Sequence, residues 1–181
     1  MAQPRRSSAA GFTLIELMLV VTVVGILASI AVPSLLRARG AAAEAATIGS
    51  LRAIHGAQTS YSSSCAGGYY AATMATLATP PKAGTPAYIG PEFKANTTDR
   101  WPYRIRLSVG PKIPQAKATC NGIAAGQSVG TFFLGADLLS TTNGMVSRYF
   151  GVNQNGIFYQ STKTVSPFYA GTPASPATTL K

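Results

Sequence analysis

The most unusual ionisable side chain in this sequence is Glu16, one of only five acids among 181 residues. It lies at the start of an apolar run, and no residue from Leu17 to Leu36 is charged. A carboxylate in hydrocarbon costs roughly 2.5–3.5 kcal/mol even on lenient insertion scales, so such a group usually has a partner and a function. Glu16 is therefore the first candidate functional residue.

The other ionisable groups give no pattern typical of an enzyme. The remaining acids are widely scattered, and the chain contains no nucleophile elbow, phosphate loop or zinc motif. His55 is the only histidine and has no Cys, Asp or Glu at ligand spacing. No acid follows Asp137, although calcium sites usually include carboxylates. We expect no catalytic residue, no metal and no cofactor.

The uncharged run predicts a membrane-spanning helix. At ~1.5 Å per residue, the twenty positions from Leu17 to Leu36 reach about 30 Å, one hydrocarbon thickness. Arg5 and Arg6 precede the run and should hold the N-terminal end in the cytoplasm. The sequence therefore predicts a transmembrane segment over residues 12–36.

The residues at the head of this run resemble a known processing signal. Gly-Phe-Thr-Leu-Ile-Glu at residues 11–16, followed by an apolar helix, resembles the class III signal of type IV prepilins and of type II secretion pseudopilins. The resemblance covers roughly residues 5–40. It implies that a membrane peptidase cuts between Gly11 and Phe12 and N-methylates Phe12. It also implies an α+β fold, in which a long N-terminal helix packs on an antiparallel sheet of about four strands.

A physical reading of Glu16 agrees with this resemblance. Cleavage would give Phe12 a free amino group, protonated near neutral pH. Glu16 lies four residues further on, on the same helical face. In a bundle of such helices, the carboxylate of one subunit can neutralise the ammonium of a neighbour, which is cheaper than burying either charge alone. The alternative is a Glu16 side chain that snorkels to the membrane interface.

An ordinary secretory signal peptide is a second interpretation of the N-terminus. Ser29 and Ala31 are small and correctly spaced for cleavage before Val32. Against this interpretation, Glu16 would lie inside the apolar region, and the apolar run continues past the cleavage site to Leu36.

Gly25 and Pro33 interrupt the apolar helix. Glycine weakens a helix by ~1 kcal/mol and proline by ~3 kcal/mol, and Pro33 also removes a backbone hydrogen bond. In the related filaments, the segment between such residues melts during assembly, so the resemblance implies a soft segment at Gly25–Pro33. A mild kink with no mechanical role is the alternative.

The helix is expected to continue to Tyr61 with an amphipathic second half. Its apolar stripe comprises Ile48, Leu51, Ile54 or His55, Gln58 and Tyr61. Glu44 and Arg52 are placed off that face. Because no other good helix is available, this stripe should pack on a sheet.

Cys65 and Cys120 are the only cysteines. If the domain lies outside the cytoplasm they can form a disulfide, which would tie the end of the helix to the middle of the domain. A loop of this length could contribute ~4 kcal/mol. Two free, buried thiols are the alternative.

Strand patterns begin after a proline-rich loop at residues 67–100. Apolar and polar residues alternate strictly from Tyr103 to Val109, and an Asn-Gly pair at residues 155–156 is a strong hairpin signal. Four strands are expected, near residues 103–109, 130–136, 145–152 and 157–161. The predicted parts are a cleaved leader (1–11), a transmembrane helix (12–36), an amphipathic helix half (37–64), a β-domain (65–166) and a flexible tail (167–181).

The charge is strongly basic, with 15 Lys and Arg and a net charge of +10. Loss of Arg5 and Arg6 with the leader would leave 13 basic and 5 acidic residues, a net charge of +8. This excess favours anionic partners such as polysaccharide, phospholipid headgroups or DNA, or serves solubility alone. The surface candidates are Arg104 and Arg106, with Trp101 and Tyr103 beside them for stacking on bases.

These observations lead us to expect a structural subunit of a type IV pilus-like filament. The resemblance implies an inner-membrane precursor with its C-terminal domain outside the cytoplasm, which becomes a cell-surface filament when assembled. Its partners would be copies of itself, the prepilin peptidase and the assembly machinery. The alternatives are a type II secretion pseudopilin and a membrane-tethered binding domain that never polymerises.

Overall fold

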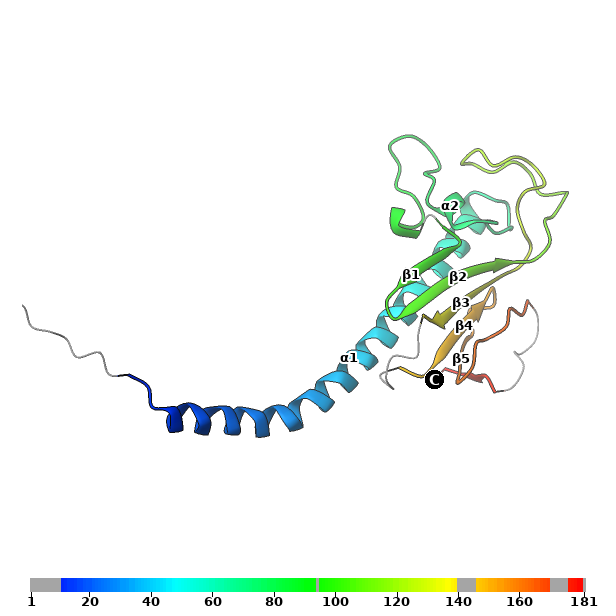
Figure 1. Ribbon diagram of the computed structural model, residues 1–181. Coiled ribbons are helices and arrows are strands. Elements are labelled where there is room, and N and C mark those ends of the chain that lie inside the picture. The colour runs from blue at the N-terminus through cyan, green and yellow to red at the C-terminus, as the bar shows by residue number, and fades with distance from the viewer. Residues whose placement is uncertain (1–10, 94, 140–145, 170–175, 181) are drawn as a thin grey trace, which may run out of the picture. The chain divides into compact units, whose positions relative to one another are not determined.

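The computed structural model describes residues 11–93, 95–139, 146–169 and 176–180 (Figure 1). The chain divides into two compact units, residues 1–39 and 40–181, which are described separately below. The regular elements are α1 (Leu14–Ser64), α2 (Met74–Leu77), the 3-10 helix η1 (Pro91–Phe93), β1 (Thr97–Arg100), β2 (Tyr103–Val109), β3 (Phe132–Leu138), β4 (Tyr149–Asn153), β5 (Phe158–Ser161) and β6 (Thr178–Thr179).

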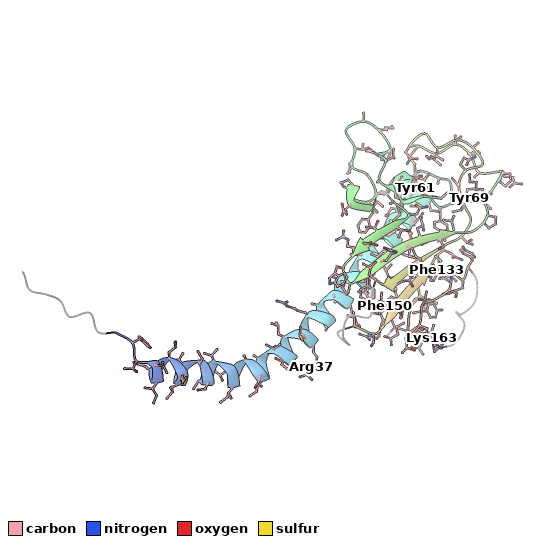
Figure 2. All side chains as sticks on the ribbon, viewed as in Figure 1. Arg37, Tyr61, Tyr69, Phe133, Phe150 and Lys163 are labelled. Atoms are coloured by element: carbon pink, nitrogen blue, oxygen red, sulfur yellow. A yellow bond between two sulfur atoms is a disulfide. The ribbon has the colours of Figure 1, made fainter. Side chains whose placement is uncertain are left out.

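The first unit contains the N-terminal part of α1. Its 18-residue apolar window has a mean hydropathy of 2.6 and is not buried against any other described residue. By length and composition, α1 is the one helix of the described chain that could cross a membrane. Figure 2 shows its side chains projecting along the whole segment up to Arg37.

In the second unit, the C-terminal half of α1 lies against the sheet, which confirms the predicted α+β fold (Figure 1). Leu51, Ile54 and Tyr61 are fully buried in the core, as their helical spacing predicted. They meet the inward-facing side chains of the sheet, which include Ile105, Phe132, Leu134, Phe150 and Val152.

The sheet is an antiparallel meander in which each strand pairs with the next along the chain, in the order β1 to β6. Strand β2 has the predicted bounds, and Tyr103, Ile105 and Leu107 face the core while Arg104 faces solvent. Strand β3 begins two residues later than expected. The Asn-Gly turn forms between β4 and β5, where Gly156 has a φ of 76° and its N–H bonds to Asn153 O at 3.0 Å. The predicted start of that hairpin at Met145 lies outside the described residues.

Two strands were not predicted from the sequence, so the sheet has six strands rather than four. Strand β1 is an edge strand with no apolar face, and its residues pair with β2 in register from Thr97–Arg106 to Arg100–Tyr103. Strand β6 has only two residues and pairs with β5.

The described part of the C-terminal segment is packed on the domain, in contrast to the flexible tail expected at residues 167–181. The Phe168 ring lies 5.3 Å from that of Phe133 and 5.1 Å from that of Tyr159. The Tyr169 hydroxyl donates to Val109 O at 2.9 Å. This segment covers the face of the sheet opposite α1, so β3 is buried on both sides: Phe132 faces the helix and Phe133 faces Phe168.

Gly151 in β4 makes room for the Phe133 ring. A Cβ added at Gly151 would lie 2.7 Å from Phe133 Cζ and 3.2 Å from Val165 Cγ1. Both neighbours are buried, with Phe133 0% and Val165 4% exposed. Glycine is therefore required at this position by close packing against an aromatic ring.

We predict that Gly151→Ala destabilises the domain by about 1–3 kcal/mol, because the methyl group overpacks a rigid site. Gly49→Ala is the matched control. Gly49 lies on an exposed face of α1 with no atom near its virtual Cβ, so this change should stabilise the helix by about 0.5–1 kcal/mol. Denaturant unfolding of the full chain in detergent, followed by near-UV circular dichroism, measures both. A Gly151→Ala variant as stable as the native chain would contradict the packing argument.

Candidate assembly site

The candidate assembly site is the head of α1, where the chain enters the helix at Leu14. Thr13 precedes the first helical residue, and its hydroxyl accepts a hydrogen bond from the Glu16 N–H at 3.3 Å. The same hydroxyl donates to Glu16 Oε2 at 3.4 Å. The first bond is that of a Thr N-cap, and the Thr-x-x-Glu sequence is that of a capping box, although Glu16 bonds to the Thr13 hydroxyl rather than to the Thr13 N–H. The sequence contained this signal at residues 13–16, and our sequence analysis missed it.

The side chains around Glu16 are exposed and apolar. Phe12 is 75% exposed, and the large aliphatic residues that follow it along the helix are also exposed. In the described residues, Glu16 forms no salt bridge, and its side chain bonds only to Thr13. The site therefore presents a carboxylate on an uncovered apolar surface.

The other polar side chains of the apolar segment are satisfied within the helix. The hydroxyls of Thr22, Ser29 and Ser34 each donate to the carbonyl three residues earlier, at 2.8, 2.7 and 2.8 Å. These bonds remove the cost of placing the hydroxyls in an apolar environment. Glu16 differs from them because no bond within its own helix can neutralise a charge.

The four remaining acids each form an ion pair with an arginine inside the second unit. The pairs are Glu92–Arg100, Asp99–Arg104, Asp137–Arg106 and Glu44–Arg148. The Glu92–Arg100 and Asp99–Arg104 pairs are exposed on both sides, so these two contribute little to stability. Their importance here is that Glu16 is the one acid of the described chain without a basic partner.

Our placement of Glu44 off the buried face of the helix was wrong. Glu44 is only 9% exposed, and its carboxylate bonds to the Arg148 guanidinium, with an Nε–Oε2 distance of 3.0 Å. Glu44 lies seven residues before Leu51, two helical turns, so it belongs to the same stripe. This pair connects α1 to the start of β4, and the Glu44 hydrogen bond raises the pKa of Arg148.

Tyr103 belongs to the same cluster, and its hydroxyl donates to Arg148 O at 2.8 Å. The side chain is fully buried. Burial raises the pKa of Tyr103, and the nearby Glu44 charge raises it further. Tyr103 is therefore a neutral structural residue. Our suggestion from the sequence that it stacks on bases was wrong, because its buried ring cannot reach them.

The two arginines expected to be a free basic surface are both engaged. Arg104 Nε lies 2.7 Å from Asp99 Oδ1, and this hydrogen bond lowers the pKa of the carboxyl. Arg106 bonds to Asp137 at 2.5 Å and to Val165 O at 2.6 Å. Trp101, by contrast, is 70% exposed. Arg104 and Arg106 thus neutralise acids of the same sheet, and they do not form the free anion-binding surface that we expected.

The predicted disulfide between Cys65 and Cys120 is present, with a Cα–Cα distance of 4.9 Å. The Cys120 N–H also donates to Cys65 O at 3.2 Å. Together these bonds hold the loop that follows β2 against the end of α1.

The remaining predicted residues lie where the sequence indicated, and their roles stay predictions. Gly11 and Phe12 precede α1, while Gly25 and Pro33 lie within its continuous helix. The softening of that segment is not tested by a static helix. His55 approaches Gln154 O at 3.4 Å. In the described ranges, no three His, Cys, Asp or Glu residues gather as a metal site would require.

Comparison with known proteins identifies the N-terminal signal. Residues 6–32 match the family model described as the prokaryotic N-terminal methylation motif. This is the class III prepilin signal of type IV pilins and pseudopilins, so the resemblance seen in the sequence is confirmed. The match covers Gly11, Phe12, Glu16 and Gly25. Neither curated proteins nor solved structures gave a match to the chain.

We predict that the domain loses stability as the pH rises above about 10, the ordinary pKa of tyrosine. The unfolded chain would release the Tyr103 proton there, whereas the raised pKa keeps it bound in the folded state. The unfolded state is then favoured as pH increases. Denaturant midpoints at pH 8 and above pH 10 measure this, and Tyr103→Phe should flatten the dependence. A pH dependence as steep in Tyr103→Phe as in the native chain would contradict it.

Proposed function

We propose that this chain is the subunit of a type IV pilus-like filament, made as a membrane-anchored precursor and polymerised through α1. The observation that carries the proposal is Glu16, an acid with no basic partner among the described residues, within a prepilin-type signal. Processing after Gly11 would create that partner, the Phe12 ammonium, in every copy. The proposed role is structural and requires neither a catalytic residue nor a cofactor.

The exposed apolar part of α1 supports an assembly in two environments. As a precursor, this segment has the length and hydropathy to lie in the inner membrane. In a fibre, the same surface would be covered by the equivalent helices of neighbouring copies. Burial of large aliphatic side chains contributes roughly 25 cal/mol per Å² of apolar surface removed from water.

The Glu16–Phe12 pair would give that packing its register. Apolar helices slide past one another at little cost, but a charge left unpaired in an apolar core is strongly disfavoured. Only the arrangement that brings a carboxylate to a neighbour's ammonium neutralises both. Glu16 therefore serves as the specificity element and the apolar surface as the source of association energy.

The second unit would form the outer part of the fibre. Its core is complete, with α1 covering one face of the sheet and the 165–169 segment on the other. It therefore needs no neighbour in order to fold. We expect it to lie outside the cytoplasm, where the Cys65–Cys120 disulfide is stable.

The first prediction from this proposal concerns the mature N-terminus. We expect the assembled chain to begin at a methylated Phe12, and Gly11→Val to retain the leader from Met1. Intact-mass and N-terminal peptide analysis of membrane and sheared fractions measures both. A mature chain that begins at Met1 would contradict processing, and one that begins at Val32 would instead support an ordinary signal peptide.

The second prediction concerns assembly. Removing one partner of a buried ion pair costs about 3–5 kcal/mol, so Glu16→Ala should lower fibre yield at least about tenfold while leaving membrane insertion intact. Ser29→Ala is the matched control, because that hydroxyl bonds only to Ile26 O within its own helix. Quantified sheared material and membrane fractions of the two variants are compared. Normal fibres from Glu16→Ala would contradict the proposed pairing.

The same preparations separate the pilus from the two alternatives. Long sheared fibres that contain this chain support the pilus. A deletion strain that loses protein secretion but retains its surface fibres supports the pseudopilin. A monodisperse membrane protein that retains its leader supports the tethered domain.

A further inference from the structure

Two Asn-Gly pairs of the described chain share the same local sequence. Both have the sequence Asn-Gly-Ile, at residues 121–123 and 155–157. In both, the glycine N–H donates to the carbonyl three residues earlier, at 3.1 Å for Gly122 and 3.0 Å for Gly156. Both glycines also have a positive φ, of 83° and 76°. Sequence and glycine backbone therefore do not distinguish the two pairs. A third pair, at residues 143–144, lies outside the described residues.

The Asn121 side chain is held at both ends of its amide. Its Oδ1 accepts a hydrogen bond from Thr119 Oγ1 at 2.7 Å, and its Nδ2 donates to Thr76 O at 2.8 Å. The neighbouring Cys120 is joined to Cys65 by the disulfide, which restrains the backbone of this loop. Any rotation of the Asn121 amide would break both side-chain bonds, and each carries a net free-energy cost.

The Asn155 side chain has no such restraint. It is exposed, in the turn between β4 and β5 (Figure 1). Its backbone N–H bonds to Asn153 Oδ1 at 3.1 Å, but its side-chain amide forms no hydrogen bond with any described residue. The amide can therefore rotate toward the backbone nitrogen of Gly156, and glycine has no side chain to obstruct that approach.

An asparagine amide in this position can react with its own backbone. The Gly156 nitrogen forms a bond to Asn155 Cγ, the Cγ–Nδ2 bond breaks, and ammonia leaves with the proton that the Gly156 nitrogen loses. Water then opens the resulting cyclic imide at either of its carbonyl carbons, which gives aspartate or isoaspartate. The sequence of steps consumes one water and releases one ammonia, and no oxidation or reduction takes place.

We propose that Asn155 is a site of spontaneous deamidation in the folded protein, whereas the hydrogen bonds of Asn121 protect it. The same three-residue sequence thus reacts or persists according to the partners of one side-chain amide. We expect Asn155 to react at least about tenfold faster than Asn121, which corresponds to a barrier difference of about 1.4 kcal/mol.

The product would add a carboxylate to a hairpin that contacts basic side chains of α1. The Arg52 guanidinium lies 5.4 Å from the centroid of the Phe158 ring, and His55 Nε2 approaches Gln154 O at 3.4 Å. Conversion of the amide would lower the net charge of a strongly basic chain by one. Because the loss of ammonia is not reversed, the fraction of converted molecules would rise with the age of the protein.

The test incubates the folded full-length protein in detergent micelles at mildly alkaline pH. Peptide mapping by mass spectrometry follows the mass change at each asparagine and resolves residues 121 and 155 from residue 143. Methyl transfer by a protein isoaspartate methyltransferase quantifies the isoaspartate product. Asn155 should convert at least about tenfold faster than Asn121 in the folded chain. In the reduced and denatured chain, where the protecting bonds are absent, the two positions should convert at similar rates.

Matched variants test the cause of the difference. Thr119→Val removes the hydroxyl that bonds to Asn121 Oδ1 and should accelerate conversion of Asn121. Thr119→Ser retains the hydroxyl and should leave Asn121 protected. Asn155→Gln should abolish the fast conversion, because the longer side chain would have to close a larger ring. Near-UV circular dichroism verifies that each variant is folded.

Equal rates at residues 121 and 155 of the folded native chain would overturn the proposal, because sequence alone would then set the reactivity. An Asn155 that stays intact in the folded chain while both positions convert in the denatured chain would also overturn it. Faster conversion at Asn121 than at Asn155 would contradict the protecting role of its hydrogen bonds. None of these measurements depends on processing of the leader or on fibre formation.

Discussion

A carboxylate on an apolar helix, with no counter-charge among the described residues, is the constraint on which the proposed organisation of this protein depends. Every other polar group of that helix segment is satisfied locally, and every other acid of the described chain has an arginine. Glu16 is thus the one acid of the described chain that no arginine neutralises. In the proposed function, cleavage after Gly11 would create the neutralising group, a new amino terminus four residues before Glu16.

The two units differ in where they bury their apolar surface. The second unit buries its apolar surface internally, since α1 covers one face of the sheet and the segment around Phe168 lies on the other. The first unit buries no apolar surface within the described chain, and in the proposed function its apolar residues would contact the membrane or neighbouring copies. α1 belongs to both units, so a single element joins the exposed apolar surface to the folded domain.

The elements that were predicted correctly from the sequence are those with a strong local residue pattern. The alternation in β2, the Asn-Gly turn and the helical stripe from Leu51 to Tyr61 are periodic signals that tertiary contacts reinforce, and each is present. Two cysteines allow only one intramolecular pairing. Strand β1 was missed because a polar edge strand has no buried face, so its sequence lacks the alternation of apolar and polar residues. The segment around Phe168 was expected to be flexible because small and polar residues dominate its composition. Its two aromatic residues, which pack on the domain, were overlooked.

The candidate site residues could likewise be predicted only where the sequence carried a local pattern. The head of α1 could be found from the sequence, because a charge within an apolar run is visible without a structure. Glu44 was misplaced by an error in applying helical periodicity, which the Arg148 contact corrected.

The outermost strands of the sheet, β1 and β6, have four and two residues and are made of Thr, Asp and Arg side chains. Unpaired strand edges tend to recruit other strands, and short polar edges suppress this tendency. In a fibre, where identical domains are crowded at high local concentration, long apolar edges would join neighbouring sheets into an amyloid-like ladder. In the proposed fibre, these short polar edges would keep the sheets of neighbouring domains from pairing, so that cohesion would come from the helices.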